Sequence, residues 1–343
     1  MFAAVFLEHG GPEQMLWEKV DDPRCGPQDV LVEVHACGLN HSDLDSRAGT
    51  ARWSLPLPWV LGAEFAGRVA QIGAEVEGIA AGDPVTAYQQ YACGRCDACD
   101  RWREDLCERF RVFGTDCWGG YGELVSVPAR AIIPLRGEED FIAAAAAQTV
   151  VSTAWSMVVG VAVVRAGETV LIPSASGGVA SGAVQAACIA GARVIASVGS
   201  PEKIEPVRAL GADVVFCHRE TAVADAIGDA TGGRGVDAVI DTTGGPLFAD
   251  HLAAMARDGR LVTCGAHAGE VVPLDIVKLF QHGHRILGFR VSTPDEIRTS
   301  LAMALDGRIR VPIDRTFPLR ETAAAHAYMA ERRHIGKIVL VRG

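Results

Sequence analysis

Four cysteines on one short segment constrain this chain more than any other feature of its sequence. They stand in the run CGRCDACDRWREDLC, with two, two and seven residues between successive cysteines. Four thiolates so spaced can surround a tetrahedral Zn²⁺ and leave no coordination position open, which is typical of a structural site. Two disulfides or an iron–sulfur cluster are the alternatives. The start MFAAVFLEHG lacks the features of a signal peptide, and the spacing differs from that of bacterial ferredoxins. We therefore expect one structural zinc ion bound by Cys93, Cys96, Cys99 and Cys107.

Length and composition limit the remaining possibilities. A chain of 343 residues with 49% hydrophobic content can form two domains, each with its own core. The net charge of −10 argues against a nucleic-acid partner. The most apolar stretch, 141–164, is interrupted by polar residues such as Gln148 and Ser152, so it predicts buried helices that link two domains and no membrane span. The other cysteines are scattered, as expected of thiols in a reducing cytoplasm.

The pattern of the chain changes near residue 150. Up to about residue 125, short β-rich runs such as VLVEVHACGL and ELVSVPA alternate apolar and polar residues, which predicts a small barrel-like domain. From about 151, strands alternate with helices, which predicts an α/β domain with a doubly wound parallel sheet. In that region Pro206 falls inside an expected helix, which we expect to be kinked there. The tail ends in GKIVLVRG, a strand that should return to the first domain.

A nucleotide site is predicted after the strand TVLIP. Gly177 and Gly178 allow the backbone to approach a pyrophosphate where the next helix begins, and its free N–H groups favour anions. The following strand ends at Val198 without the acidic residue that usually holds the ribose of NAD. Small residues, a hydroxyl and a cation stand there instead, which favours NADPH over NADH. The expected contacts here are Ser176, Gly177, Gly178, Val179, Ser200 and Lys203, with Thr242, Gly265 and Ala266 at later strand ends bordering the nicotinamide.

Several motifs together resemble the zinc-containing medium-chain alcohol dehydrogenases. They are the spacing of the four cysteines, HACGLNHSDLDSRAG (35–49), LGAEFAGRVAQIG (61–73), GDPV (82–85) and ASGGVA (175–180). The resemblance covers the whole chain. It implies a GroES-like β-barrel catalytic domain over 1–150 with a zinc lobe at about 91–109, a Rossmann domain over 151–290, and a return to the catalytic domain over 291–343.

The sequence departs from these dehydrogenases where they bind their catalytic zinc. The three positions that carry metal ligands in the family hold Asn40, Ala63 and Thr149 here. Asn is a poor zinc ligand, Ala cannot be one, and a threonine hydroxyl does not match the set of ligands that zinc prefers. We therefore expect the catalytic zinc to be missing. The alternative is that Glu64 and an unidentified histidine rebuild it.

The resemblance implies further site residues. His41 matches a basic pyrophosphate contact, Ser42 a proton-relay hydroxyl, and Lys337 a second basic residue near the pyrophosphate. The nucleotide segment also resembles that of the quinone oxidoreductases, which use NADPH. His218, Arg219 and Arg332 could add contacts there, or they could be ordinary surface residues.

These features predict an NADPH-dependent reductase of quinones or enones, with Asn40, His41 and Ser42 as the candidates for holding the acceptor oxygen. We expect it to be cytoplasmic and to form a homodimer or homotetramer. One alternative is a zinc alcohol dehydrogenase with unusual ligands, which would contain about two zinc ions per subunit where our interpretation requires about one. The other is a cofactor-binding protein without enzymatic activity, which would bind NADPH and turn nothing over.

Overall fold

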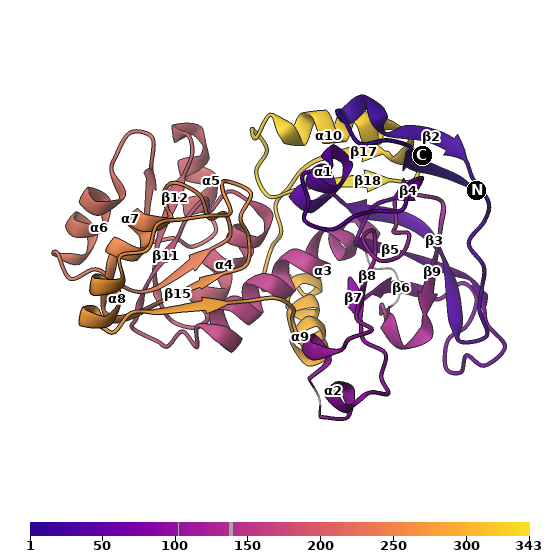
Figure 1. Ribbon diagram of the computed structural model, residues 1–343, viewed down its shortest axis with the longest axis horizontal. Coiled ribbons are helices and arrows are strands. Elements are labelled where there is room, and N and C mark those ends of the chain that lie inside the picture. The colour runs from indigo at the N-terminus through magenta and orange to yellow at the C-terminus, as the bar shows by residue number, and fades with distance from the viewer. Residues whose placement is uncertain (102, 137–139) are drawn as a thin grey trace. The chain divides into compact units, whose positions relative to one another are not determined.

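The computed structural model describes residues 1–101, 103–136 and 140–343, which divide into two compact units (Figure 1). Unit 1 comprises Met1–Thr149, Thr293–Asp306 and Ile313–Gly343. Unit 2 comprises Val150–Ser292 and Gly307–Pro312. The chain therefore builds most of unit 1, forms unit 2, and then returns to complete unit 1.

Unit 1 is based on mainly antiparallel sheets. Its largest sheet has the strand order β10-β6-β5-β3-β18-β17, with β9 paired to β3, and a smaller sheet has the order β2-β1-β4. The C-terminal strand β18 lies beside β3, so the end of the chain completes a sheet that its first part began. The strands are β1 (Phe2–Phe6), β2 (Leu16–Lys19), β3 (Asp29–Gly38), β4 (Trp59–Val60), β5 (Glu64–Ile72), β6 (Pro84–Ala87), β7 (Gln90–Tyr91), β8 (Arg111–Val112), β9 (Leu124–Pro128), β10 (Ile132–Pro134), β17 (Ile313–Pro318) and β18 (Lys337–Val341).

The helices of unit 1 begin and end at recognisable residues. Helix α1 follows β3 directly, and the Asp43 side chain accepts a hydrogen bond of 2.8 Å from the Asn40 backbone N–H before it. Gly49 ends α1 in the left-handed conformation, with φ of 74°, which glycine adopts without strain. The helices are α1 (His41–Ala48), α2 (Asp97–Asp100), α3 (Phe141–Trp155), α9 (Pro294–Leu305) and α10 (Thr322–Ala330), with 3₁₀ turns η1 (Pro12–Gln14), η2 (Glu104–Leu106), η3 (Ala129–Ala131) and η6 (Leu319–Glu321).

Unit 2 contains a six-stranded parallel sheet, as the alternating pattern predicts. Its strand order is β13-β12-β11-β14-β15-β16, the order of a dinucleotide-binding doubly wound sheet. The strands are β11 (Thr169–Ile172), β12 (Arg193–Val198), β13 (Val214–Cys217), β14 (Val236–Asp241), β15 (Met255–Thr263) and β16 (Arg285–Gly288). The helices are η4 (Ser156–Val161, a π-helical turn), α4 (Gly178–Ile189), η5 (Pro201–Lys203), α5 (Ile204–Arg208), α6 (Val223–Thr231), α7 (Phe248–Ala253) and α8 (Ile276–His282).

Both faces of this sheet are buried. Along β11, Val170 and Ile172 belong to one apolar cluster, while Leu171 belongs to the cluster on the opposite face. The small residues of α4 allow close packing, because a Cβ on Gly182 would lie 3.0 Å from the Cβ of Ala154. Burial on both faces explains why the strands of this sheet are continuous apolar runs in the sequence.

One local prediction needs correction. The expected helix around Pro206 is divided into η5 and the short α5. Pro206 therefore lies in the first turn of α5, where a missing backbone N–H costs no helical hydrogen bond.

One helical stretch among the described residues, Phe141–Val161, is long and apolar enough to cross a membrane by length and composition. A core helix meets the same criterion, and 67% of the apolar window is buried in the protein. The burial agrees with the predicted role as a core helix, and the absence of a membrane segment stays a prediction.

Candidate functional site

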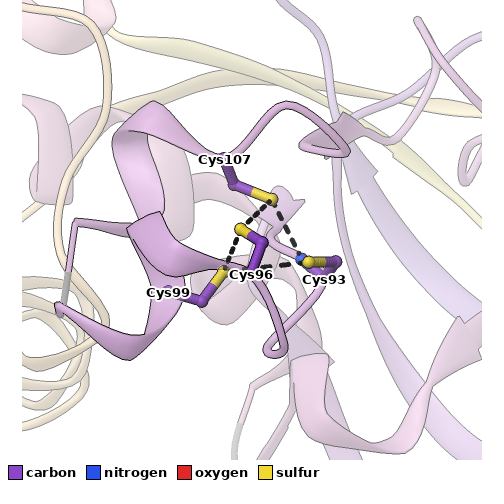
Figure 2. Close-up of side chains that lie close together, drawn as sticks. All are labelled: Cys93, Cys96, Cys99 and Cys107. Atoms are coloured by element: carbon purple, nitrogen blue, oxygen red, sulfur yellow. Dashed lines mark hydrogen bonds between the residues drawn. The ribbon is translucent and has the colours of Figure 1, made fainter.

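The four cysteines of the lobe lie close together, as their spacing predicts (Figure 2). The Sγ atoms of Cys96 and Cys99 are 3.5 Å apart, those of Cys96 and Cys107 3.8 Å, and those of Cys93 and Cys99 4.0 Å. Zinc–sulfur bonds of about 2.3 Å in a tetrahedron place sulfurs about 3.8 Å apart. The arrangement therefore fits one zinc ion bound by four sulfurs.

The surroundings of the lobe favour the thiolate form of Cys93. Its pKa is lowered to about 6, chiefly because the backbone N–H of Arg95 donates a hydrogen bond to the sulfur. Arg109 donates a further hydrogen bond of 3.3 Å to the same sulfur. Across residues 1–101, 103–136 and 140–343, this is the one group of three or more Cys, His, Asp or Glu side chains placed to share a metal ion.

A different arrangement occupies the region where the resemblance places a catalytic metal. We call Asn40, Glu64 and Lys337 the Asn40 cluster. The Lys337 ammonium forms an ion pair with Glu64 Oε1, and it donates hydrogen bonds of 2.8 Å to Asn40 Oδ1 and 2.7 Å to the carbonyl oxygen of Leu39. The Asn40 Nδ2 donates a hydrogen bond of 2.9 Å to Glu64 Oε1. The side chains of Lys337 and Glu64 are 3% and 0% exposed, so this is a buried ion pair.

The backbone of unit 1 is shaped to hold the Glu64 carboxylate. Gly38 is the cross-strand partner of Glu64, and a Cβ on Gly38 would lie only 2.5 Å from Glu64 Oε1. The Thr149 backbone N–H donates a hydrogen bond of 3.0 Å to Glu64 Oε2. Both carboxylate oxygens are thus engaged, and the close approach requires a glycine at position 38.

The chemistry of these groups does not fit a catalytic zinc ion. Asn40 presents an amide, Ala63 a methyl group and Thr149 a hydroxyl, and the single carboxylate of Glu64 is already neutralised by the Lys337 ammonium. A divalent cation here would meet a positive charge and one strong ligand, where a catalytic site supplies three. These residues therefore support no metal-dependent chemical step.

Cys37 and Asp43 lie deeper in the same unit. A Cβ on Gly62 would lie 2.8 Å from the Cys37 sulfur, and burial raises the pKa of this thiol well above its usual range, so Cys37 is a core residue. Burial also raises the pKa of Asp43 to about 6, although its carboxylate accepts hydrogen bonds of 2.8 Å from the Tyr121 hydroxyl and the Asn40 N–H. Strand β3 ends at Gly38, so Asn40 lies outside the strand that carries Cys37.

The predicted nucleotide segment of unit 2 has the form of an anion site. Ser176, Gly177 and Gly178 connect β11 to α4, and Gly177 precedes a helix of 12 residues that no side chain caps. A Cβ on Gly177 would meet nothing closer than 3.5 Å, so the backbone there is open to close approach. The unpaired N–H groups and the dipole of the helix favour a pyrophosphate, so these residues fit a dinucleotide.

The 3₁₀ turn η5, which follows β12, contains an acidic residue, Glu202, that the sequence reasoning did not single out. Ser200 donates a hydrogen bond of 2.5 Å to Glu202 Oε1, and this bond lowers the pKa of the Glu202 carboxyl. Lys203, the cation expected to meet a 2′-phosphate, is buried. The available signal was the sequence Ser200-Pro201-Glu202, in which a serine at the N-cap position precedes a helical turn that contains an acid.

The other predicted nucleotide residues of unit 2 follow strand ends. His218 and Arg219 follow β13, and burial, assisted by the Arg219 cation, lowers the pKa of His218. His218 therefore offers a hydrogen bond and little positive charge at neutral pH. Thr242 follows β14, and a Cβ on Gly265 would lie 2.2 Å from the Thr242 carbonyl oxygen, so these loops touch. Ala266 is the next residue in the second of these loops.

The remaining predicted residues belong to unit 1. His41 and Ser42 begin α1, and the ring of His41 lies 6.1 Å from that of His334. Arg332 follows α10 with a φ of 56°. All three hydrogens of the Lys337 ammonium have acceptors within unit 1. These hydrogen bonds disfavour the predicted contact between Lys337 and a pyrophosphate, which stays a prediction.

Comparison with known proteins identifies the class of enzyme. Residues 26–137 match the alcohol dehydrogenase GroES-like domain, and residues 178–306 match the zinc-binding dehydrogenase family. The chain is 30% identical to the quinone oxidoreductase of Pseudomonas aeruginosa, over 98% of each chain. It is 25% identical to the acryloyl-coenzyme A reductase of Sulfurisphaera tokodaii, over 96% of this chain and 97% of that protein.

The fold agrees with these matches. The crystal structure of an NAD-dependent alcohol dehydrogenase aligns with a TM-score of 0.95 at 36% identity, over 100% of both chains. The α/β fold with a GroES-like domain and a parallel Rossmann sheet is thereby confirmed. Quinone oxidoreductases and alcohol dehydrogenases both occur among the relatives, so the reaction class is established as oxidoreduction and the substrate is not. The chain belongs to the medium-chain dehydrogenase/reductase superfamily of oxidoreductases.

Proposed function

We propose that this chain is an NADPH-dependent reductase of quinones or α,β-unsaturated carbonyl compounds that works without a catalytic zinc ion. The observation that carries the proposal is the Asn40 cluster. Asn40, Ala63 and Thr149 stand where the related alcohol dehydrogenases are expected to place their metal ligands, and beside Asn40 a buried ion pair joins Lys337 and Glu64. The relatives described as a quinone oxidoreductase and an acryloyl-coenzyme A reductase support the proposed acceptors.

The absence of a Lewis acid restricts the substrates. A metal ion contributes several kcal/mol by polarising a carbonyl oxygen, and simple ketones and alcohols react slowly without it. Quinones and enones delocalise the incoming negative charge onto an oxygen through conjugation, so hydrogen-bond donors suffice. Conjugated acceptors are therefore the class that these residues can serve.

The chain contributes binding and proton donation. NADPH, when bound, supplies a hydride from C4 of its nicotinamide and becomes NADP⁺. The acceptor gains the hydride at a ring carbon or β-carbon, and its oxygen then takes a proton. Asn40 donates a hydrogen bond to that oxygen, and His41 or Ser42 delivers the proton. Thr242, Gly265 and Ala266 border the nicotinamide at the carboxyl ends of β14 and β15.

The preference for NADPH depends on the end of β12. Val198 leaves this strand without an acid at its last position, and Arg219 offers a cation on the neighbouring strand end. Glu202 opposes the preference, because its carboxylate accepts from Ser200 and would repel a 2′-phosphate. The Glu202 side chain must rotate away from Ser200 before the Ser200 hydroxyl can donate a hydrogen bond to the 2′-phosphate.

Other parts of the proposal concern the assembly. The cysteine lobe would hold one structural zinc ion per subunit. We expect a homodimer or homotetramer, since β16 ends the strand order of its sheet and exposed apolar residues such as Val271 and Phe280, 89% and 66% exposed, lie nearby in the sequence. The ten cysteines are all free thiols, which supports a reducing cytoplasm.

Turnover of a panel of quinones, enones and simple ketones, each with NADPH and NADH, tests the function. We expect conjugated acceptors to be reduced, with NADPH preferred by about tenfold or more, since a charged hydrogen bond contributes about 1.5–3 kcal/mol. Glu202→Gln should increase that preference. Rapid reduction of simple ketones together with about two zinc ions per subunit would identify a zinc alcohol dehydrogenase instead. Tight NADPH binding without turnover of any acceptor would identify a non-enzymatic role.

A further inference from the structure

The two ends of the Asn40 carboxamide have different partners. Its Oδ1 lies 2.8 Å from the ammonium nitrogen of Lys337, and its Nδ2 lies 2.9 Å from Glu64 Oε1. An ammonium can only donate hydrogen bonds, and a carboxylate can only accept them. Rotating the amide by half a turn would set its NH₂ against the ammonium and its oxygen against the carboxylate. The ion pair therefore permits one orientation of the amide.

The ion pair is itself held in place. The Lys337 ammonium is anchored by the Leu39 carbonyl oxygen, and the far oxygen of Glu64 by the Thr149 N–H. Lys337 begins β18 and Glu64 begins β5, and both strands pair with β3. Three rigid elements thus fix the position of a single side-chain amide at the start of α1.

This orientation leaves one hydrogen-bond donor for a ligand. Nδ2 has two hydrogens, and Glu64 accepts one of them. Among the residues that the structure describes, no partner is recorded for the second hydrogen. The cation on Oδ1 polarises the amide and strengthens its remaining N–H as a donor, as in cooperative hydrogen-bond chains.

We propose that Lys337 and Glu64 are positioning residues, which orient and polarise the Asn40 amide so that its free N–H binds the oxygen of the acceptor. A zinc ion would place its positive charge directly on that oxygen, whereas the charge of Lys337 acts on it through the Asn40 amide. This inference rests on the proposed reduction of quinones or enones. It assigns to Lys337 a role in the chemical step, distinct from contact with the cofactor.

Single-turnover hydride transfer measures the coupling between these residues. Asn40→Ala should slow the step by on the order of a hundredfold, as the loss of one oxyanion donor does. Lys337→Met should slow it by at least about tenfold, because misplacement of a binding group is costly. If Lys337 acts through Asn40, the double variant is no slower than Asn40→Ala alone. If the double variant is slowed by the product of the two single factors, the proposal is overturned, because a general structural role of Lys337 predicts independent effects.

Arg342→Met is the matched control. It removes a cation that pairs with Glu33 of β3, but both side chains of this pair are exposed. The rate of hydride transfer should be unchanged. NADPH affinity, measured by fluorescence, should be equal in wild type and Lys337→Met, and a loss of affinity that accounts for the slower rate would instead assign Lys337 to the cofactor.

A measurement on the wild-type protein decides the orientation even if variants misfold or no acceptor is reduced. The side-chain amide signals of Asn40, identified by their absence in Asn40→Ala or by selective labelling, can be followed by NMR. We expect one hydrogen protected from solvent exchange and the other exchanging freely, with a bound inert quinone or enone analogue shifting only the second. Equivalent, rapidly exchanging hydrogens would overturn the proposal. If no acceptor is reduced but this exchange pattern is observed, the proposed function is refuted, whereas the orientation of the Asn40 amide is confirmed.

Discussion

The cysteine lobe and the Asn40 cluster are two polar arrangements in the same unit with opposite charge balance. The lobe brings together four sulfurs that become anionic when they bind a metal, and the cation described beside them, Arg109, is exposed and contacts one sulfur. The Asn40 cluster contains one buried carboxylate, one buried ammonium and a neutral amide. The first arrangement needs an external cation to be stable as thiolates, and the second contains its own. Counting charges therefore indicates which of the two requires zinc.

The largest effect is expected when the lobe is broken. Cys107→Ser replaces a buried sulfur ligand, and the protein should lose nearly all of its zinc together with several kcal/mol of folding free energy linked to metal binding. Zinc content and thermal unfolding measure this. Cys117→Ser, a change outside the four-sulfur group, should keep about one zinc ion per subunit. A folded Cys107→Ser protein with its full zinc content would contradict the assignment.

A smaller effect is expected when the buried ion pair is broken on one side. Glu64→Leu leaves the Lys337 ammonium without its counterion and should lower the free energy of unfolding by about 3–5 kcal/mol. Glu64→Leu combined with Lys337→Met removes both charges and should be more stable than Glu64→Leu alone. Urea denaturation gives the free energies. If the double variant lost as much free energy of unfolding as the two single variants together, the two charges would not depend on each other.

The smallest effect concerns Asp43, whose carboxylate accepts hydrogen bonds from two neutral groups, the Tyr121 hydroxyl and the Asn40 N–H. Its pKa of about 6 in the folded protein exceeds the usual value of 3.8, so the folded state binds the proton more tightly than the unfolded state does. Its contribution therefore favours folding at low pH and is lost as pH rises through about 6, by at most about 3 kcal/mol. The stability of wild type relative to Asp43→Asn should increase as pH falls from 7 to 4.5. A difference that stays constant with pH would refute the shift.

The sequence was sufficient where the determining residues are close in the chain. The four cysteines and the alternation of strands and helices act over short distances, and the structure shows the cysteine group and the parallel sheet that they predict. The glycines lie at the start of α4 as expected, and their contact with a nucleotide stays a prediction. The Asn40 cluster could be predicted only in part. The missing metal ligands were evident, but the bonds from Lys337 to Asn40 and Glu64 span 297 and 273 residues and depend on β18 pairing with β3. The hydrogen bond from Ser200 to Glu202 was missed although it is local, because the sequence reasoning looked for an acid only at the last residue of β12.

The fit between Gly38 and Glu64 has an evolutionary consequence. A sequence that lost this ion pair would have to change Lys337 and Glu64 together, because each buried charge depends on the other. Replacing Lys337 first would leave a carboxylate buried without a partner, held where only a glycine neighbour allows it. Each single step passes through a less stable protein, so selection would oppose the intermediates. Gly38, Glu64 and Lys337 are thus expected to change together or not at all.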